Sequence, residues 1–318
     1  MLAIVCPGQG SQLPGFLSPW LELPGVAEQL GQLSETIGMD LTAHGTTSDA
    51  ETIRDTAVAQ PLIVAAGLIS ASCLFPVGAV PAGVVAGHSV GEFTAAVLAG
   101  VITAEEALSL VNVRGRAMAE ASAVTPTGMS AVLGGDATEV VEAIARHGLT
   151  AANMNGSGQV VAAGTLEQLA ALAADPPAKA RIAPLKVAGA FHTHHMAPAV
   201  DALSRAASAV VPGDPAVRLL SNTDGAVMTD GRETLARIVR QVSGPVRWDA
   251  CTTTMADLGV TAVLELLPGG TLAGMIKRGL RGTRIVALKT PADLDAAREL
   301  LASDDVVTLH HDSAGALS

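Results

Sequence analysis

The segment that most constrains the fold of this chain is Gly87-His88-Ser89-Val90-Gly91-Glu92. Residues 83–86 form an apolar run that predicts a buried strand, and residues 93–98 predict a helix. A strand, a sharp turn and a helix are the context in which Gly-x-Ser-x-Gly exposes a reactive serine at the edge of an α/β sheet. The two glycines allow the backbone to pack closely beneath the turn. We therefore predict an α/β fold organised around Ser89.

Ser89 is the predicted nucleophile of this turn. We expect the helix to start at the serine, so that free backbone N–H groups and the positive end of the helix dipole face any anion formed there. The alternative is a serine that only caps an ordinary helix. The preceding strand, together with His88 and Glu92 in the motif, favours the nucleophile.

The bulk composition excludes several classes of protein. The chain has 318 residues, of which 49% are hydrophobic and 15% charged, as in a globular protein with a large core. The net charge of -11 argues against nucleic acid or an anionic membrane as a partner. The longest uncharged stretch, residues 56–91, contains Gln60-Pro61 and further prolines. It predicts a buried helix followed by a core strand rather than a membrane span.

Cysteine usage points to a reducing compartment. Cys6, Cys73 and Cys251 are odd in number and lack metal-ligand spacing, so we expect no disulfide framework. The first residues show no basic segment followed by an apolar one, so we expect no secretion signal. These features predict a cytoplasmic protein.

The predicted secondary structure changes near Ser122, after which short strands and helices alternate. Residues 122–128 have the composition of a linker, and residues 129–187 alternate in the order β-α-β-β-α-β. We predict a small ferredoxin-like α+β domain over residues 122–187. It is inserted into a large α/β-hydrolase-like domain with a mostly parallel sheet, formed by residues 1–121 and 188–318.

A serine nucleophile needs a base, and His192 is the predicted one. It follows a strand-like segment of the large domain, where loops collect at an α/β site. His88 adjoins the nucleophile, but its side chain should leave the turn in another direction. His194 and His195 could form a metal site with His192, but no carboxylate accompanies them at helical spacing, so we expect no metal.

An acid that orients the base is missing from the sequence pattern. No carboxylate stands out at a strand end soon after Ser89. A backbone carbonyl can do the same task by fixing which ring nitrogen of the imidazole carries the proton. We expect no catalytic role for His310 or His311 in the C-terminal tail.

Two positively charged sites in the sequence, one of them a single arginine, each allow two interpretations. Arg114 shares a helix face with apolar residues, where it must either meet an anion or form an internal ion pair with Glu120 or Glu92. A second group of four cations within eight positions is either a local basic patch or a solvated helix end; its members are Lys277, Arg278, Arg281 and Arg284.

Six motifs occur in one order along the chain. They are Gly-Gln-Gly-Ser-Gln at 8–12, Gln60-Pro61, Gly-His-Ser-Val-Gly-Glu at 87–92, Arg114-Gly115 before Met118, Phe191-His192 before Met196, and Gly244-Pro245-Val246-x-Trp248. Together they resemble the malonyl-CoA:acyl-carrier-protein transacylases of fatty acid and polyketide synthesis. The resemblance runs from about residue 3 to about residue 290. Each motif is weak alone, and six in order are specific.

The resemblance implies a ping-pong transfer of a malonyl group from malonyl-CoA to the phosphopantetheine thiol of acyl carrier protein, without a cofactor. It assigns Ser89 as nucleophile, His192 as base, the backbone N–H groups of Gln9 and Val90 as oxyanion hole, Arg114 as partner of the malonyl carboxylate, the Gln241 carbonyl as the group that orients the imidazole, and Gln60, His88, Met118 and Phe191 as pocket residues. A bulky Phe191 should exclude an α-methyl branch. The cations at 277–284 become candidates for carrier-protein binding.

Three rival functions remain open. A serine esterase or thioesterase shares the serine turn but has no use for Arg114. A polyketide-dedicated stand-alone acyltransferase would use the same residues. A non-catalytic module that only docks carrier protein would not need Ser89, His192 and Arg114 together.

Overall fold

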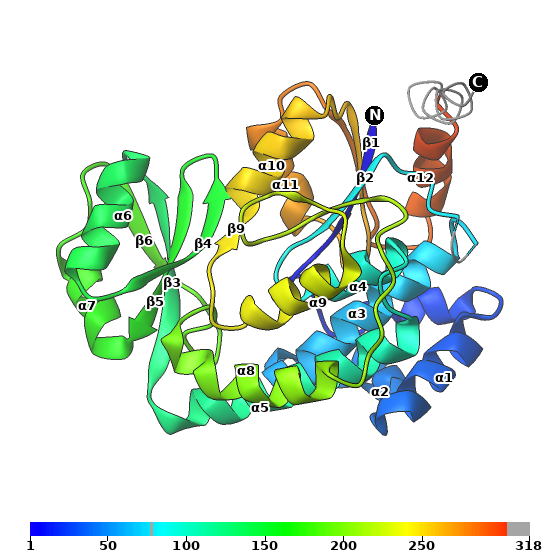
Figure 1. The fold of residues 1–318 in the computed structure, drawn as a ribbon, viewed down its shortest axis with the longest axis horizontal. Helices are drawn as coiled ribbons and strands as arrows, with labels where there is room; N and C mark the ends of the chain where they lie inside the picture. Colours follow the sequence, from blue (N-terminus) through cyan, green and yellow to red (C-terminus); the bar gives the residue numbers. More distant parts are fainter. Residues whose placement is uncertain (77–78, 304–318) are drawn as a thin grey trace.

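A computed structural model describes residues 1–76 and 79–303 of the chain. It contains two sheets, one in the centre of the larger part of the molecule and one in a lobe at its side (Figure 1). The large sheet has the strand order β11-β10-β1-β2-β7-β8. Its strands are β1 (Leu2–Cys6), β2 (Val84–Gly87), β7 (Arg218–Leu220), β8 (Val227–Met228), β10 (Ala262–Glu265) and β11 (Arg284–Ala287).

The large sheet is parallel except at one edge. The pairs β11-β10, β10-β1, β1-β2 and β2-β7 are parallel, and β8 pairs antiparallel with β7. The helices of this part lie between the strands along the chain, except the last, which follows β11; they are α1 (Val26–Ile37), α2 (Leu41–Thr46), α3 (Thr56–Ser72), α4 (Gly91–Leu98), α5 (Ala104–Val124), α8 (Ala197–Ala207), α9 (Gly231–Arg240), α10 (Trp248–Asp257), α11 (Thr271–Gly279) and α12 (Asp293–Leu301). Short 3-10 helices cover Ser18–Glu22, Thr52–Arg54 and His194–Met196.

Both faces of the large sheet are buried, as the apolar strand sequences require. In β1, Leu2, Ile4 and Cys6 belong to one apolar cluster, and Ala3 and Val5 belong to another, because successive side chains point to opposite faces. The first cluster includes side chains of α1, α3, α4 and α5, and the second includes side chains of α10 and α11. The core therefore has three layers.

The small sheet has the order β6-β3-β5-β4-β9. Its strands are β3 (Thr127–Gly134), β4 (Thr150–Gly156), β5 (Gln159–Thr165), β6 (Ala180–Pro184) and β9 (Val246–Arg247), and two helices, α6 (Ala137–Arg146) and α7 (Leu166–Ala174), pack on it. Four of the strands come from the middle of the chain and pair antiparallel, whereas β9 comes from later in the chain and pairs parallel with β4. The two sheets are thus joined by more than the α5–β3 connection.

The predicted linker over residues 122–128 is wrong. The helix α5 continues to Val124, and β3 begins at Thr127, so only two residues separate them. The helix ends there because Pro126 disfavours helical backbone at the preceding residue, and Thr125 is extended with φ −137° and ψ 134°. One long helix thus leads directly from the large sheet into the small one (Figure 1).

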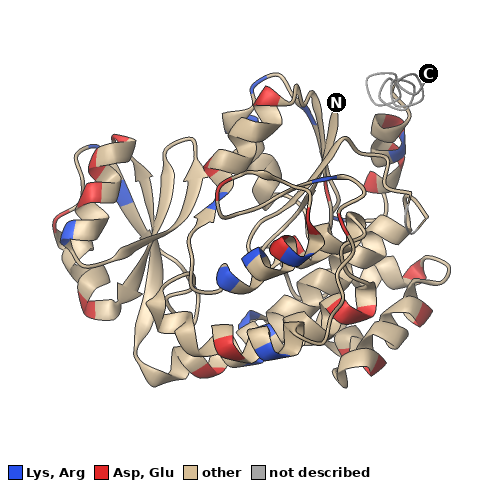
Figure 2. Cartoon of the chain, viewed as in Figure 1, with Lys and Arg blue, Asp and Glu red and all other residues tan. Residues whose placement is uncertain are grey.

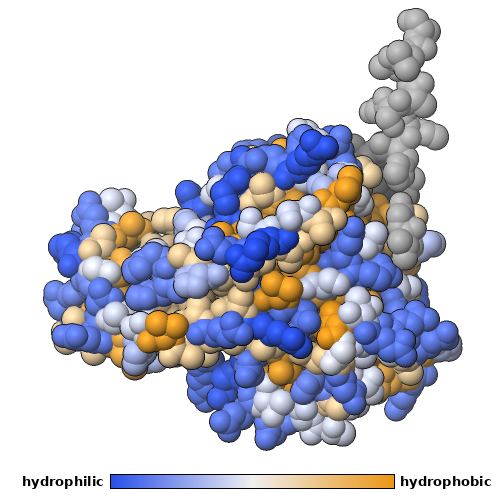
Figure 3. Space-filling model, turned by 60° about the horizontal axis from the view of Figure 1, so that its bottom comes forward, coloured by the Kyte–Doolittle hydropathy of each residue, from blue (hydrophilic) through white to orange (hydrophobic). Residues whose placement is uncertain are grey.

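Charged side chains lie mainly on the outer helices and loops, and both signs occur along α9 (Figure 2). In the view of Figure 3, hydrophilic residues cover most of the surface and hydrophobic ones are scattered, as is normal for a folded domain. Among the described residues, no helix has the length and apolar character needed to cross a membrane. His310 and His311 lie outside the described residues.

Candidate active site

Ser89 lies in a turn at the carboxyl end of β2. This strand is the neighbour of β1 in the middle of the large sheet. Its φ of 53° is left-handed, a conformation that a non-glycine residue adopts only where the surrounding structure imposes it. The helix α4 begins at Gly91 and not at the serine as predicted, because left-handed backbone cannot be part of a right-handed helix. Ser89 therefore stands just before the helix N-terminus.

The glycines of the motif have the steric role that the sequence predicts. A Cβ atom on Gly87 would lie 2.1 Å from the backbone of Gly91, and one on Gly91 would lie 2.1 Å from the carbonyl oxygen of Cys6. Real Cβ atoms do not approach other atoms so closely. Only glycine therefore fits at either position, and β1, β2 and α4 meet beneath Ser89 by direct backbone contact.

His192 meets Ser89 although more than one hundred residues separate them in the chain. The Nε2 atom of His192 lies 2.8 Å from the Oγ atom of Ser89, and its Nδ1 atom lies 2.8 Å from the carbonyl oxygen of Gln241. A carbonyl oxygen only accepts hydrogen bonds, so Nδ1 carries the proton and Nε2 is free to accept one from the serine hydroxyl. His192 also has left-handed backbone, with φ 61°.

The surroundings of His192 keep its imidazole neutral. Burial, and then the positive charge of Arg114, lower the pKa of His192 to about 3, from an ordinary value of 6.5. A neutral imidazole with an unprotonated Nε2 beside a hydroxyl is the state that a general base requires.

Arg114 projects from the middle of α5 toward the serine. Its Nη2 atom lies 3.4 Å from Ser89 Oγ, and its side chain is almost completely buried. Two neutral amides accept its other hydrogen bonds, Gln60 Oε1 at 2.6 Å from Nη1 and Gln241 Oε1 at 2.9 Å from Nη2. Its Nε–H has no hydrogen-bond partner among the described residues.

No described carboxylate forms an ion pair with Arg114, so the interpretation as an internal ion pair with Glu92 or Glu120 is wrong. Burial lowers the pKa of the guanidinium to about 10, and the charge of Glu92 opposes this effect. The arginine thus stays charged near neutral pH, while part of its hydrogen-bonding capacity is unused beside the serine. An unused charged donor in a buried position is suited to an anionic ligand.

A cavity of about 240 Å³ opens above these residues, with Ser89, Val90 and His192 in its lining. The four predicted pocket residues also line it, namely Gln60, His88, Met118 and Phe191. The small sheet forms one wall through Met129, Asn153, Asn155 and Val161, and α11 forms another through Thr271 and Met275. The cavity therefore lies between the two sheets, at the carboxyl ends of the parallel strands, where α/β folds usually bind ligands.

His88 turns away from the serine, as predicted. Its Nε2 atom lies 3.0 Å from Asn155 Oδ1 on β4, and its ring packs edge-on against Trp248. His88 thus connects the serine turn to the small sheet.

The loop after β1 brings Gln9 to the cavity. Its side chain donates to the carbonyl oxygen of Arg54 at 3.2 Å, which ties the loop to the start of α3. Within the described part of the chain, neither the Gln9 N–H nor the Val90 N–H donates a hydrogen bond. Both residues line the cavity beside Ser89.

Sequence reasoning missed the role of Asn222 and of the motif residue Glu92. Asn222 follows β7, the parallel neighbour of β2, and its Oδ1 atom accepts the N–H of Ser89 at 2.8 Å. Its own N–H donates to Glu92 Oε1 at 2.8 Å. The position of Asn222 at the carboxyl end of a parallel strand was the available signal, because such ends meet at the site.

The cations at 277–284 take no part in the hydrogen bonds described around Ser89. They lie at the C-terminal end of α11 and in the loop and strand that follow. Lys277, Arg278, Arg281 and Arg284 are all exposed, and Arg284 donates to Ser303 Oγ at 2.8 Å.

His194 and His195 stack on each other at 4.1 Å between ring centroids. Within the described residues, no group of three or more His, Cys, Asp or Glu side chains is arranged to hold a metal ion.

Comparison with known proteins gives the same class as the geometry. The family model described as "Acyl transferase domain" matches residues 3–308. A malonyl CoA-acyl carrier protein transacylase of Mycobacterium tuberculosis (strain ATCC 25618 / H37Rv) is 52% identical over 303 residues, covering 94% of this chain and 100% of the relative. The transacylase of Escherichia coli (strain K12) is 34% identical over 305 residues, covering 94% and 99%.

Solved structures agree with this result. The crystal structure of MCAT from Mycobacterium tuberculosis superposes with a TM-score of 0.89 at 50% identity, covering 94% of this chain and 99% of that one. A malonyl-transacylase solved in complex with its type II PKS acyl-carrier protein superposes with a TM-score of 0.87 at 31% identity, covering 94% and 99%. The chain belongs to the malonyl CoA-acyl carrier protein transacylase family.

Proposed function

We propose that this enzyme transfers the malonyl group of malonyl-CoA to the phosphopantetheine thiol of acyl carrier protein and so supplies the extender unit for fatty acid or polyketide synthesis. The observation that carries the proposal is the convergence of three groups on one atom. Ser89 Oγ lies 2.8 Å from the unprotonated nitrogen of His192 and 3.4 Å from the guanidinium of Arg114.

The first half-reaction loads the serine. Ser89 Oγ attacks the thioester carbonyl of malonyl-CoA while His192 Nε2 takes the hydroxyl proton. The oxyanion of the tetrahedral intermediate accepts hydrogen bonds from the backbone N–H groups of Gln9 and Val90. When the intermediate collapses, the C–S bond breaks and the sulfur of coenzyme A leaves with the proton from His192. Arg114 meanwhile pairs with the free malonyl carboxylate.

The second half-reaction reverses these steps with a different thiol. The phosphopantetheine thiol gives its proton to His192 and attacks the ester carbonyl, and Ser89 leaves as a hydroxyl after recovering that proton. The Gln241 carbonyl keeps the proton on Nδ1 throughout. Neither step changes an oxidation state, and His192 carries both proton transfers, so the proposal includes no cofactor and no metal.

The finer description of the fold is also a proposal. We propose that residues 1–121 and 188–318 form an α/β-hydrolase-like domain and that residues 122–187 form a ferredoxin-like insert. The order β6-β3-β5-β4 and the chain order β3-α6-β4-β5-α7-β6 support it. Free Cys6, Cys73 and Cys251 support a reducing compartment, and we propose the cytoplasm.

Mass spectrometry of the intact protein tests the reaction. After incubation with malonyl-CoA we expect one malonyl increment, and little or none after methylmalonyl-CoA because Phe191 borders the cavity. The Ser89→Ala variant should remain unlabelled, whereas Ser208→Ala, at an exposed serine directly after α8, should be labelled like the wild type. Persistent labelling of Ser89→Ala would remove the proposed nucleophile.

The acceptor distinguishes a transferase from a thioesterase. Labelled enzyme mixed with holo acyl carrier protein should pass the malonyl group to the carrier thiol, with little free malonate. Reversal of charge at Lys277, Arg278 and Arg281 should raise KM for carrier protein and leave loading from malonyl-CoA unchanged. No effect on either substrate would return these cations to the interpretation as a solvated helix end.

A further inference from the structure

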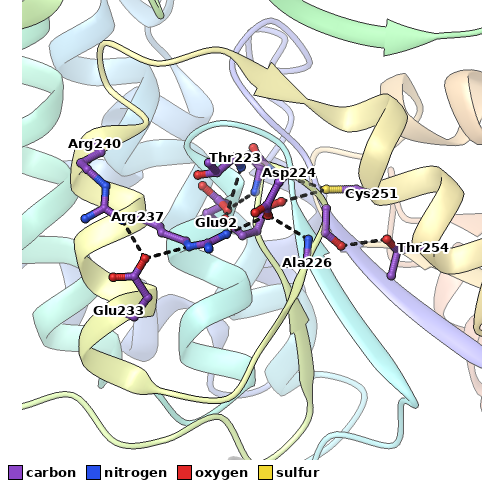
Figure 4. Close-up of polar contacts among 12 residues, drawn as sticks. Glu92, Thr223, Asp224, Ala226, Glu233, Arg237, Arg240, Cys251 and Thr254 are labelled. Atoms are coloured by element: carbon purple, nitrogen blue, oxygen red, sulfur yellow. Dashed lines mark hydrogen bonds and ion pairs between the residues drawn. The ribbon is translucent and has the colours of Figure 1, made fainter.

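Glu92 is a buried carboxylate for which the proposed reaction has no task. It lies in the first turn of α4 and is 4% exposed. Its Oε1 atom accepts the N–H of Asn222 at 2.8 Å, and its Oε2 atom accepts the side-chain Nε2–H of Gln241. Figure 4 shows Glu92 close to Thr223 and Arg237, in the region between α4 and α9.

The amide of Gln241 joins Glu92 to the guanidinium at the serine. Its Nε2 group donates to Glu92 and, at 3.0 Å, to the carbonyl oxygen of Ser89. Its Oε1 atom accepts from Arg114 Nη2 at 2.9 Å. An ionised carboxylate only accepts hydrogen bonds and a guanidinium only donates them, so the amide satisfies both neighbours in one orientation alone.

We propose that Glu92 is a positioning residue that determines specificity for a carboxylate-bearing acyl group, because it fixes the Gln241 amide so that its oxygen aims Arg114 at the substrate. This inference rests on the proposed function. The carboxylate of Glu92 contacts neither Ser89 nor the cavity, and only the backbone N–H of Glu92 donates to the Ser89 carbonyl oxygen, at 3.1 Å. It acts through Gln241 on Arg114, and it should matter for malonyl groups far more than for acetyl groups.

The substitution Glu92→Gln breaks this arrangement without changing its size. A glutamine has one acceptor oxygen, and the backbone N–H of Asn222 is fixed and takes it. The new NH₂ group then faces Gln241, whose amide must turn and present its own NH₂ group to Arg114. Two donors then confront each other, and Arg114 loses an acceptor that holds it beside Ser89.

Protonation of Glu92 should have the same effect as the substitution. Burial raises the pKa of Glu92 to about 7, although hydrogen bonds from Asn222 and Gln241 and the charges of Arg114 and Arg237 favour the carboxylate. The titratable groups that face it are Arg114 on α5, Arg237 on α9 and Cys251 on α10. The pKa values of Arg114, His192 and Cys251 all lie outside the range from pH 6 to 8, and the pKa of Arg237 is raised above its ordinary value.

The experiment compares loading of Ser89 from malonyl-CoA and from acetyl-CoA by rapid quench. For Glu92→Gln at pH 8, we expect the ratio of kcat/KM for malonyl over acetyl to fall about tenfold or more, with acetyl loading changed by less than about threefold. The same substitution at an exposed site, Glu233→Gln on α9, should leave the ratio unchanged. In the Arg114→Ala background, Glu92→Gln should no longer alter the ratio.

A measurement on the wild type covers the case in which Glu92→Gln does not fold. The malonyl-to-acetyl ratio should fall several-fold from pH 8 to pH 6, as Glu92 takes up its proton. An unchanged ratio in this titration overturns the inference, as does an unchanged ratio in a folded Glu92→Gln enzyme. If the wild type loads no malonyl group at all, the proposed function fails instead, so the two failures are distinguishable.

Discussion

Arg114 and Arg237 are identical side chains placed in opposite environments. Arg237 is on α9 and pairs with Asp224 at 2.7 Å and with Glu233 at 2.9 Å, and its side chain is 21% exposed (Figure 4). These hydrogen bonds raise the pKa of Arg237. Arg114 is buried between two neutral amides, and desolvation lowers its pKa.

The difference shows how the same cation serves stability in one place and recognition in another. An arginine with carboxylates on both sides is neutralised and has little left to offer a ligand. An arginine held by glutamine oxygens has no carboxylate in direct contact, at a cost in desolvation that a bound anion would relieve. The glutamines at positions 60 and 241 are therefore as informative as the arginine itself.

The largest expected effect follows removal of the buried cation. Arg114→Ala should lower kcat/KM for malonyl-CoA by about 10²–10³-fold, because the substrate carboxylate loses its charged partner in a desolvated site. Acetyl-CoA carries no such carboxylate and should lose less than about threefold. The matched control is Arg205→Ala, at an exposed arginine on α8, which should leave both substrates unaffected. Equal losses for malonyl and acetyl groups would mean that Arg114 supports the serine and not the substrate.

The next effect converts the buried arginine into a paired one. Gln60→Glu places a carboxylate at the position of an amide that now accepts from Arg114 Nη1 at 2.6 Å. The internal anion should compete with the substrate and lower malonyl loading about 10- to 100-fold, while the melting temperature is maintained or rises. Steady-state loading and thermal unfolding measure the two results. Undiminished malonyl loading would show that the neutrality of residue 60 is unimportant.

The lowered pKa of His192, caused by burial and then by the charge of Arg114, should affect stability. The pKa of His192 is lowered to about 3 in the folded protein, from 6.5 when unfolded. The corresponding stability is present above pH 6.5 and is lost as pH falls toward 3, because the unfolded state binds the proton first. Relative to His192→Gln, the wild type should lose about 1.4 kcal/mol of unfolding free energy per pH unit between pH 6 and 4. Urea unfolding across this range provides the measurement, and parallel curves would contradict a neutral His192.

The smallest effect belongs to the surface arginine. Arg237→Gln should cost about 0.5–1 kcal/mol of unfolding free energy, since exposed ion pairs are weak and screened by salt. The loss should shrink at high salt, and the malonyl-to-acetyl ratio at pH 8 should change by less than about twofold, because Arg237 is the weakest of the groups that favour the Glu92 carboxylate. A larger change in that ratio would place Arg237, and not only Arg114, in the control of specificity.

The sequence predicted the reactive residues of the site better than the groups that hold those residues in place. Ser89, His192 and Arg114 each stood out by residue type and context, and the structure brings both His192 and Arg114 within hydrogen-bond reach of the Ser89 hydroxyl. The orienting carbonyl of Gln241 followed from family resemblance alone, because a backbone oxygen leaves no trace in residue type. Asn222 did not stand out, since the pairing of β7 with β2 cannot be read from the residues of either segment.

Several elements escaped prediction for reasons of length and context. The strand β9 has two residues, too few for any periodic pattern, and is defined by its partner β4. The helix α5 ran through a segment whose serines and alanines suggested a linker, and the single proline at 126 decided where it stopped. Boundaries set by one residue or by a distant partner are those that local composition predicts worst.

The close backbone packing under the serine turn has a consequence for every variant named above. Glycine at 87 and 91 leaves no room for even one added carbon, so close main-chain packing fixes the backbone of the turn that carries the hydroxyl. Exchanges of side chains around the turn can change charge, proton affinity or selectivity while this backbone keeps its place. The backbone of the Ser89 turn is thus fixed separately from the side chains that set charge and selectivity. Rate changes in such variants can therefore be interpreted as changes in chemistry and not as displacement of the turn.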